Sequence, residues 1–236
     1  MPETGLPEVL LFDLDDTILR FSAGQPNCWR FALERHVPER ADHAALLTAI
    51  ELEGTDFWAP AARAFWGRQN MHAARRLIAS SALTGHGISL GLCHRIADEM
   101  TERKEELVRP FDGALEVLQR LRQRGHRLGL LTNGSAAFQR RKLMRFELEP
   151  LFDLILIEGE LGYGKPDRRV FEAALAHFGV SAEACWMIGD NLEADVAGAR
   201  ELGIKAIWHD AHGAGLPGSP AVVPDRVIRS LSELLQ

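Results

Sequence analysis

Val9-Leu10-Leu11-Phe12-Asp13-Leu14-Asp15-Asp16-Thr17 is the stretch of sequence that decides the fold of this chain. Its four apolar residues are typical of a buried strand in a parallel sheet, and the acids follow where the carboxyl end of that strand opens into a crevice. Since residues two apart on a strand point to the same side, Asp13 and Asp15 are expected to lie together. Two like charges placed together need a cation or a shared proton. The stretch therefore predicts a site that holds a metal and uses carboxylates chemically.

The composition is that of an ordinary globular protein. The chain has 236 residues, of which 46% are hydrophobic and 25% are charged, so it can bury a large core. The net charge of −6 argues against a nucleic-acid partner, because such proteins usually carry a basic face. Residues 1–5 lack the pattern of a secretory signal, and no apolar run is long enough to cross a membrane. Three widely spaced cysteines predict buried thiols in a cytoplasmic protein, not disulfides or a zinc cluster: Cys28, Cys93 and Cys185.

Two kinds of pattern divide the chain. Residues 21–109 have helical periodicity and few strand-like runs, whereas residues 110–236 alternate helices and strands. Alternation predicts a parallel sheet that is covered on both faces. We therefore expect an α/β fold in which residues 1–20 and 110–236 form a Rossmann-like, doubly wound core with a helical cap inserted at 21–109. The insert holds equal numbers of acidic and basic residues, so the net negative charge belongs to the core.

Distinctive polar groups follow the predicted strands at four places. They are Asp13 with Asp15, Thr132 with Asn133, Lys165, and Asp190 with Asp195. The carboxyl ends of the strands in a doubly wound sheet converge on one crevice, so we expect these groups to meet. A metal ion and a lysine that neutralise phosphoryl oxygens, a hydroxyl that orients them and a carboxylate nucleophile suit phosphoryl transfer. A second carboxyl can give a proton to the departing alcohol and later take one from water.

These residues resemble the four motifs of the haloacid dehalogenase-like hydrolase superfamily, in the same order and across the whole chain. The motifs are Asp13-Leu14-Asp15-Asp16-Thr17, Thr132-Asn133-Gly134, Lys165-Pro166-Asp167, and Gly189-Asp190 followed by Asp195. The helical insert resembles the C1-type cap of that superfamily. The stretches 159–167 and 189–195 are similar to phosphatases of the N-acylneuraminate-9-phosphatase and nucleotidase kind.

The resemblance implies a role for each of these positions. Asp13 is expected to be the nucleophile and a ligand of Mg²⁺, and Asp15 the general acid and base, whose backbone carbonyl also binds the metal. Thr132 and the backbone of Asn133 are expected to bind the phosphoryl group, which Lys165 neutralises. Two further acids complete the set, Asp190 as a metal ligand and Asp195 as a second-shell residue that steadies Lys165 or metal-bound water. Oxygen ligands with retained waters also suit Mg²⁺ on general grounds.

The leading interpretation is a Mg²⁺-dependent phosphatase that acts on a small phosphorylated metabolite through an aspartyl-phosphate. A dehalogenase on the same scaffold is disfavoured because Asp15 is present, and halide is a leaving group that needs no proton. A phosphosugar mutase stays open. A receiver-like signalling domain is about half this length, and a binding protein without catalysis has no need for the complete set of polar groups. The sequence specifies neither the substrate nor the oligomeric state.

Local sequence signals make further predictions. Asp112 is predicted to cap one helix, Ser135 another, and Pro166 to lie in the first turn of a third. Within the insert, Trp58, Phe65 and Trp66 are expected to pack in its interior or at its seam with the core, with a substrate contact as the less favoured alternative. Three arginines are interpreted as a solvated helix face, with contact to an anionic substrate as the alternative: Arg68, Arg75 and Arg76.

Overall fold

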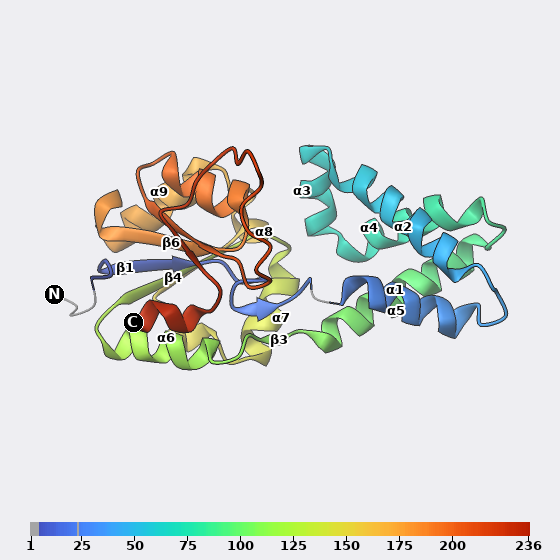
Figure 1. The fold of residues 1–236 in the computed structure, drawn as a ribbon, viewed down its shortest axis with the longest axis horizontal. Helices are drawn as coiled ribbons and strands as arrows, with labels where there is room; N and C mark the ends of the chain where they lie inside the picture. The colour runs from blue at the N-terminus through green and yellow to red at the C-terminus, as the bar shows by residue number, and fades with distance from the viewer. Residues whose placement is uncertain (1–4, 23) are drawn as a thin grey trace. The chain divides into compact units, whose positions relative to one another are not determined.

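The structure, a computed structural model, describes residues 5–22 and 24–236 (Figure 1). The prediction about a secretory signal concerns residues 1–5, of which 1–4 lie outside the described part. The chain divides into two compact units. Residues 1–20 and 109–236 form the sheet unit, and residues 21–108 form the helical unit. None of the described helices is long and apolar enough to span a membrane.

The sheet unit is built on six parallel strands in the order β5-β4-β1-β6-β7-β8. Strand β1 (Val9–Phe12) is central, and it pairs with β4 (Arg127–Thr132) on one side and β6 (Cys185–Gly189) on the other. Its side chains are fully buried on both faces, which explains its unbroken apolar sequence. The outer strands are β5 (Leu154–Ile157), β7 (Lys205–His209) and β8 (Arg226–Ile228). A separate two-stranded ribbon joins β2 (Leu19–Arg20) to β3 (Arg109–Pro110).

Helices cover both faces of this sheet. Figure 1 shows α9 (Arg168–Phe178) on one face and α6 (Ala114–Gln123) on the other. Val9 and Leu11 of β1 pack in the same core cluster as Phe171 and Phe178 of α9. The remaining segments are α7 (Ala136–Arg145), α8 (Glu158–Leu161), α10 (Gly198–Arg200), η1 (Glu149–Leu151), η2 (Ala182–Ala184), η3 (Leu192–Ala197) and η4 (Leu231–Leu235). The predicted Rossmann-like α/β fold is confirmed.

The helical unit consists of α1 (Gln25–His36), α2 (His43–Trp58), α3 (Ala61–Gln69), α4 (Met71–Thr84) and α5 (Leu90–Leu107). It has its own apolar core, in which Leu33, Leu46 and Ile96 are fully buried. Trp58 is partly buried against this core. Phe65 and Trp66 are 37% and 41% exposed, so of the positions expected for them the interior of this unit is excluded.

Three local predictions were wrong. Helix α6 begins at Ala114, and the residue at its N-cap position is Gly113, not Asp112. Gly113 has a φ of 75°, a left-handed conformation that glycine adopts without strain. Helix α9 begins at Arg168, because the Asp167 side chain caps it by accepting a hydrogen bond from the Arg169 backbone N–H. Pro166 therefore lies before the helix and not in its first turn. Arg75 is not solvated, since only 4% of its surface is exposed.

The Ser135 prediction is confirmed. The Ser135 side chain accepts a hydrogen bond of 3.4 Å from the Phe138 backbone N–H at the start of α7. This cap fixes where α7 begins after β4, and it thereby orients the helix that follows the Thr132-Asn133 motif.

Candidate active site

Three carboxylates meet at the carboxyl ends of β1 and β6. Asp13 follows β1, Asp190 follows β6, and Asp195 lies in η3. Each contributes an oxygen to a group whose atoms lie within 4.8 Å of one another. The backbone N–H of Asp13 donates to Ile188 O at 2.9 Å, which extends the β1–β6 pairing to the acid itself. The position of Asp13 is therefore fixed by the central strands.

Lys165 lies among these carboxylates and is buried. Its Nζ donates to Asp13 Oδ1 and to Asp195 Oδ1, each at 2.6 Å. Asp195 is held in turn, because its Oδ2 accepts from the Asn191 backbone N–H at 3.0 Å. Asp13 Oδ2, although buried, has no hydrogen-bond partner in the described part of the chain. Lys165 thus engages one oxygen of Asp13 and leaves the other unpaired.

The charges of this cluster do not balance. One ammonium group faces three carboxylates, which leaves two excess negative charges when all three are ionised. Burial, with repulsion from Asp195, raises the pKa of Asp13 to about 7 although Lys165 opposes this. Burial and then repulsion from Asp13 raise the pKa of Asp190 to about 9. Neighbouring carboxylates raise the pKa of Lys165 against the effect of its own burial, so it stays charged. The cluster therefore holds protons unless another cation replaces them.

Asp15 lies apart from the three-carboxylate group and has its own partners. Both of its carboxylate oxygens accept from Lys142 Nζ of α7, at 2.6 and 2.5 Å. Its Oδ2 also accepts from Gln139 Nε2 at 3.0 Å. Asp15 is partly exposed whereas Lys142 is buried. The side chains of Asp13 and Asp15 are thus held separately, one by Lys165 and the other by α7.

The Thr132-Asn133 motif follows β4 and is joined to both of these centres. Thr132 is buried, and its hydroxyl oxygen accepts from Gln139 Nε2 at 2.7 Å. The Asn133 amide makes a reciprocal pair with the backbone of Lys165, donating to its carbonyl at 2.7 Å and accepting from its N–H at 2.8 Å. The Asn133 side chain is therefore occupied with positioning the Lys165 segment.

Comparison with known proteins identifies the family. The family model for haloacid dehalogenase-like hydrolases matches residues 7–203. The chain belongs to this family. It is 31% identical over 207 residues to glyceraldehyde 3-phosphate phosphatase of Pyrococcus abyssi, covering 85% of this chain and 80% of that protein.

Two further similarities place it among haloacid dehalogenase-like hydrolases. Phosphoserine phosphatase of Thermus thermophilus is 47% identical over 125 residues, a match that spans 52% of this chain and only 49% of that protein. The HAD-hydrolase YfnB of Bacillus subtilis, whose magnesium-bound crystal structure reveals interdomain movement, has a TM-score of 0.74 at 27% identity over 97% of both chains. The predicted family membership is confirmed.

The residues of this haloacid dehalogenase-like site fit a divalent cation. The unpaired oxygen of Asp13 is buried beside two more carboxylates, and hard cations such as Mg²⁺ prefer oxygen ligands. The pKa values of Asp13 and Asp190 are raised first by burial and then by repulsion from neighbouring carboxylates, and a bound cation would oppose both effects. The acids that could provide side-chain ligands are therefore Asp13, Asp190 and Asp195, and the carboxylate of Asp15 is engaged elsewhere.

Three residues that contact the predicted site residues of this hydrolase were not identified from the sequence. Gln139 and Lys142 hold Asp15, and Glu158 accepts a hydrogen bond of 2.8 Å from the Gly134 backbone N–H. The spacing of Gln139 and Lys142 could have indicated a shared role, because residues three apart lie on the same face of a helix. Polar residues on the buried face of a helix that follows a strand-end motif need a partner, and Asp15 supplies it.

Proposed function

We propose that this chain is a phosphatase that hydrolyses a small organic phosphomonoester through an aspartyl-phosphate on Asp13. The observation that carries the proposal is that two acids only two residues apart in sequence differ in burial and in hydrogen-bond partners. Asp13 is buried with one oxygen unpaired, and Asp15 is held apart from it by Lys142. One carboxylate is therefore available to attack, and a second is available for proton transfer.

The reaction has two steps. In the first, an Asp13 oxygen attacks phosphorus, the phosphorus–oxygen ester bond breaks, and Asp15 gives its proton to the leaving alcohol. In the second, Asp15 takes a proton from water, the water oxygen attacks phosphorus, and the bond from phosphorus to Asp13 breaks to release phosphate. Lys165 neutralises phosphoryl oxygens, while Thr132 and the Asn133 backbone orient them.

Mg²⁺ is the cofactor that we assign to this site, with Asp13 and Asp190 as side-chain ligands and the backbone carbonyl of Asp15 as a third. When bound, it neutralises the charge that develops on the phosphoryl oxygens. Asp195 is assigned to hold Lys165, a role that its 2.6 Å contact supports.

The helical unit is proposed to act as a cap that closes over the substrate and excludes water. The compact unit at 21–108 supports this assignment. All three cysteines are free and buried, which supports our placing the enzyme in the reducing cytoplasm.

The test is a panel of phosphorylated metabolites assayed with Mg²⁺ for released phosphate. We expect turnover by the wild-type chain and none by Asp13→Asn, with unchanged circular dichroism. The other chemistries give different results, namely an isomer without phosphate for a mutase, halide from 2-chloropropionate for a dehalogenase, and a long-lived phospho-protein for a receiver. Undiminished turnover by Asp13→Asn would overturn the proposal.

A further inference from the structure

Gln139 of α7 is buried beside the Thr132-Asn133 motif, and three groups contact its amide nitrogen. Only 1% of the residue is exposed. Its Nε2 donates to Asp15 Oδ2 at 3.0 Å, to Thr132 Oγ1 at 2.7 Å and to the Asn133 carbonyl at 2.6 Å. All four residues belong to the sheet unit. Gln139 therefore lies where the residue assigned to proton transfer and those assigned to phosphoryl binding meet.

The orientation of the Gln139 amide follows from its neighbours. A carboxylate and a backbone carbonyl have no hydrogen to donate, so the nitrogen of the amide, not its oxygen, has to face Asp15 and Asn133. This leaves Gln139 Oε1 buried and without a hydrogen-bond partner in the described part of the chain. A buried acceptor without a partner is costly, so the amide orientation serves the three groups that it contacts.

The contact with Gln139 limits where the hydrogen of the Thr132 hydroxyl can point. A hydroxyl has one hydrogen and two lone pairs, whereas an amide nitrogen donates and does not accept. Gln139 Nε2 therefore occupies a lone pair of Thr132 Oγ1, and the hydroxyl hydrogen points away from Gln139. Because Thr132 is buried, that hydrogen needs an acceptor close by.

The Asn133 carbonyl is the competing acceptor for this hydrogen. It lies 3.5 Å from Thr132 Oγ1, at the outer limit of a hydrogen bond, and only 2.6 Å from Gln139 Nε2. The same peptide group is held at its other end, because the Gly134 N–H donates to Glu158 Oε2 at 2.8 Å. The carbonyl thus stays engaged with Gln139, and the Thr132 hydrogen is left for an acceptor that enters the site.

We propose that Gln139 is a positioning residue that directs the Thr132 hydroxyl as a donor to a phosphoryl oxygen. The proposal rests on the proposed phosphatase function, in which Thr132 orients the phosphoryl group, and it adds a residue outside the four motifs. Without Gln139, the Thr132 hydroxyl turns to the Asn133 carbonyl, which Glu158 still holds in place through the Gly134 N–H. The phosphoryl group then loses a donor.

Calorimetric titration of the whole chain with inorganic phosphate, in the presence of Mg²⁺, measures the effect of this donor. Phosphate has no leaving alcohol, so proton transfer by Asp15 does not enter the measurement. We expect Gln139→Met to weaken phosphate binding about 10-fold, and Thr132→Val to weaken it by a similar factor. The double variant should bind phosphate within about twofold of Thr132→Val alone, because Gln139 acts through the hydroxyl.

Gln119→Met is the matched control, because it makes the same change at an exposed glutamine of α6. It should leave the phosphate affinity unchanged. A merely structural role of Gln139 predicts that the losses in the double variant add, since a distorted fold weakens binding whether or not the Thr132 hydroxyl is present. Additive losses, wild-type affinity in either single variant, or no phosphate binding by the wild-type chain overturns the proposal.

A crystal structure of the wild-type chain with inorganic phosphate and Mg²⁺ tests the proposal without a substitution, and so protects the test against misfolding of Gln139→Met. We expect a phosphate oxygen at about 2.7–3.0 Å from Thr132 Oγ1, while Gln139 Nε2 keeps its contact with that hydroxyl. A phosphate that does not contact Thr132, or a Gln139 amide turned away from Thr132, overturns the proposal.

Turnover assays on the same variants separate this proposal from the proposed function. Coupling between Gln139 and Thr132 in phosphate binding supports the positioning role even if no phosphomonoester is hydrolysed. Hydrolysis by the wild-type chain, together with independent effects of the two substitutions on phosphate binding, leaves the phosphatase function intact and overturns the role of Gln139.

Discussion

Lys142 Nζ donates to both carboxylate oxygens of Asp15, at 2.6 and 2.5 Å, from a buried position on α7. This pair joins the residue assigned to proton transfer to the helix that follows the Thr132-Asn133 motif. Gln139, three residues before Lys142, contacts Asp15, Thr132 and the Asn133 carbonyl through one amide nitrogen. Helix α7 therefore connects the residue assigned to proton transfer with the residues assigned to phosphoryl binding.

Replacement of Lys142 should impair the transfer of a proton to the leaving group. In Lys142→Met, Asp15 loses its charged partner and its fixed orientation, and a misplaced catalytic group can cost about 100-fold in rate. We expect kcat to fall about 10- to 100-fold for alkyl phosphates. The loss should be smaller for p-nitrophenyl phosphate, because nitrophenolate leaves without needing a proton. Steady-state kinetics with both substrates measures this difference.

Arg141→Met provides the control for that measurement. Arg141 is the exposed neighbour of Lys142 on the same helix and its guanidinium lies over the Phe138 ring, so its replacement removes one positive charge from the same helix. Equal losses for alkyl and aryl substrates in Lys142→Met would assign Lys142 a merely structural role.

The metal-free protein should become less stable as the pH rises. Asp13 and Asp190 have folded-state pKa values of about 7 and about 9 against an ordinary value of 3.8, so the folded state binds more protons than the unfolded state between these limits. The contribution of these two groups to the free energy of unfolding is therefore fully present below about pH 4. It is lost as the pH rises through 7 and 9, by at most about 1.4 kcal/mol per pH unit for each group. Urea unfolding in EDTA from pH 5 to 9 measures this slope, which Asp190→Asn should reduce.

Binding of Mg²⁺ should release protons. At pH 7 the metal-free site holds a proton on Asp190 and is half-protonated at Asp13, and a ligating carboxylate must lose its proton. We expect between about one and two protons released per ion at pH 7, with an apparent affinity that increases up to about pH 9. Calorimetric titration with Mg²⁺ in buffers of different ionisation enthalpy measures the number of protons released. A heat of binding that does not depend on the buffer would contradict the assigned ligands.

The convergence of the polar residues that follow the strands could be predicted from the sequence, because it depends on one general property of parallel sheets. Parallel strands deliver their carboxyl ends to one edge, so Asp13 and Asp190 converge although 177 positions separate them in the sequence. The family resemblance was recognisable for the same reason, since the motifs follow successive strands. The family and the fold class were both predictable from short apolar runs and the residues that end them.

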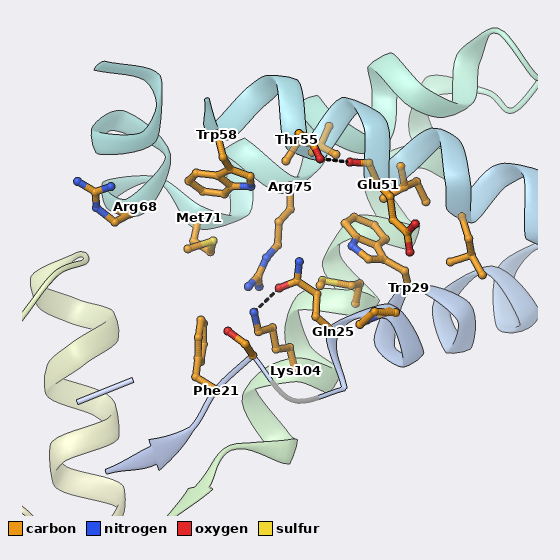
Figure 2. A pocket seen from close by; sticks show the side chains of 17 residues that line it. Phe21, Gln25, Trp29, Glu51, Thr55, Trp58, Arg68, Met71, Arg75 and Lys104 are labelled. Atoms are coloured by element: carbon orange, nitrogen blue, oxygen red, sulfur yellow. Dashed lines mark hydrogen bonds between the residues drawn. The ribbon is translucent and has the colours of Figure 1, made fainter. Parts of the chain in front are cut away.

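The helical features were less predictable because periodicity identifies a buried face without saying what packs on it. Arg75 and Arg76 are neighbours in sequence, yet Arg75 lines a cavity of the helical unit (Figure 2) and Arg76 pairs with Asp98. The Lys142–Asp15 pair joins residues 127 positions apart in sequence through a tertiary contact that no local pattern encodes. Backbone conformation also decided one helix start, where Gly113 replaced the expected Asp112 cap.

Gly189 has no room for a side chain, which yields the last prediction. It ends β6, and a Cβ built there would overlap the carboxylate of Asp195, the partner of Lys165. Gly189→Ala should therefore displace Asp195, lower the free energy of unfolding by about 1–3 kcal/mol and reduce kcat at least about tenfold through Lys165. Gly218→Ala is the control, because a Cβ there meets no atom within 4 Å and the change in stability should stay within about 0.5 kcal/mol. Urea unfolding curves and assays of phosphate release compare the two variants with the wild-type chain. A wild-type kcat in Gly189→Ala would show that Asp195 does not control the position of Lys165.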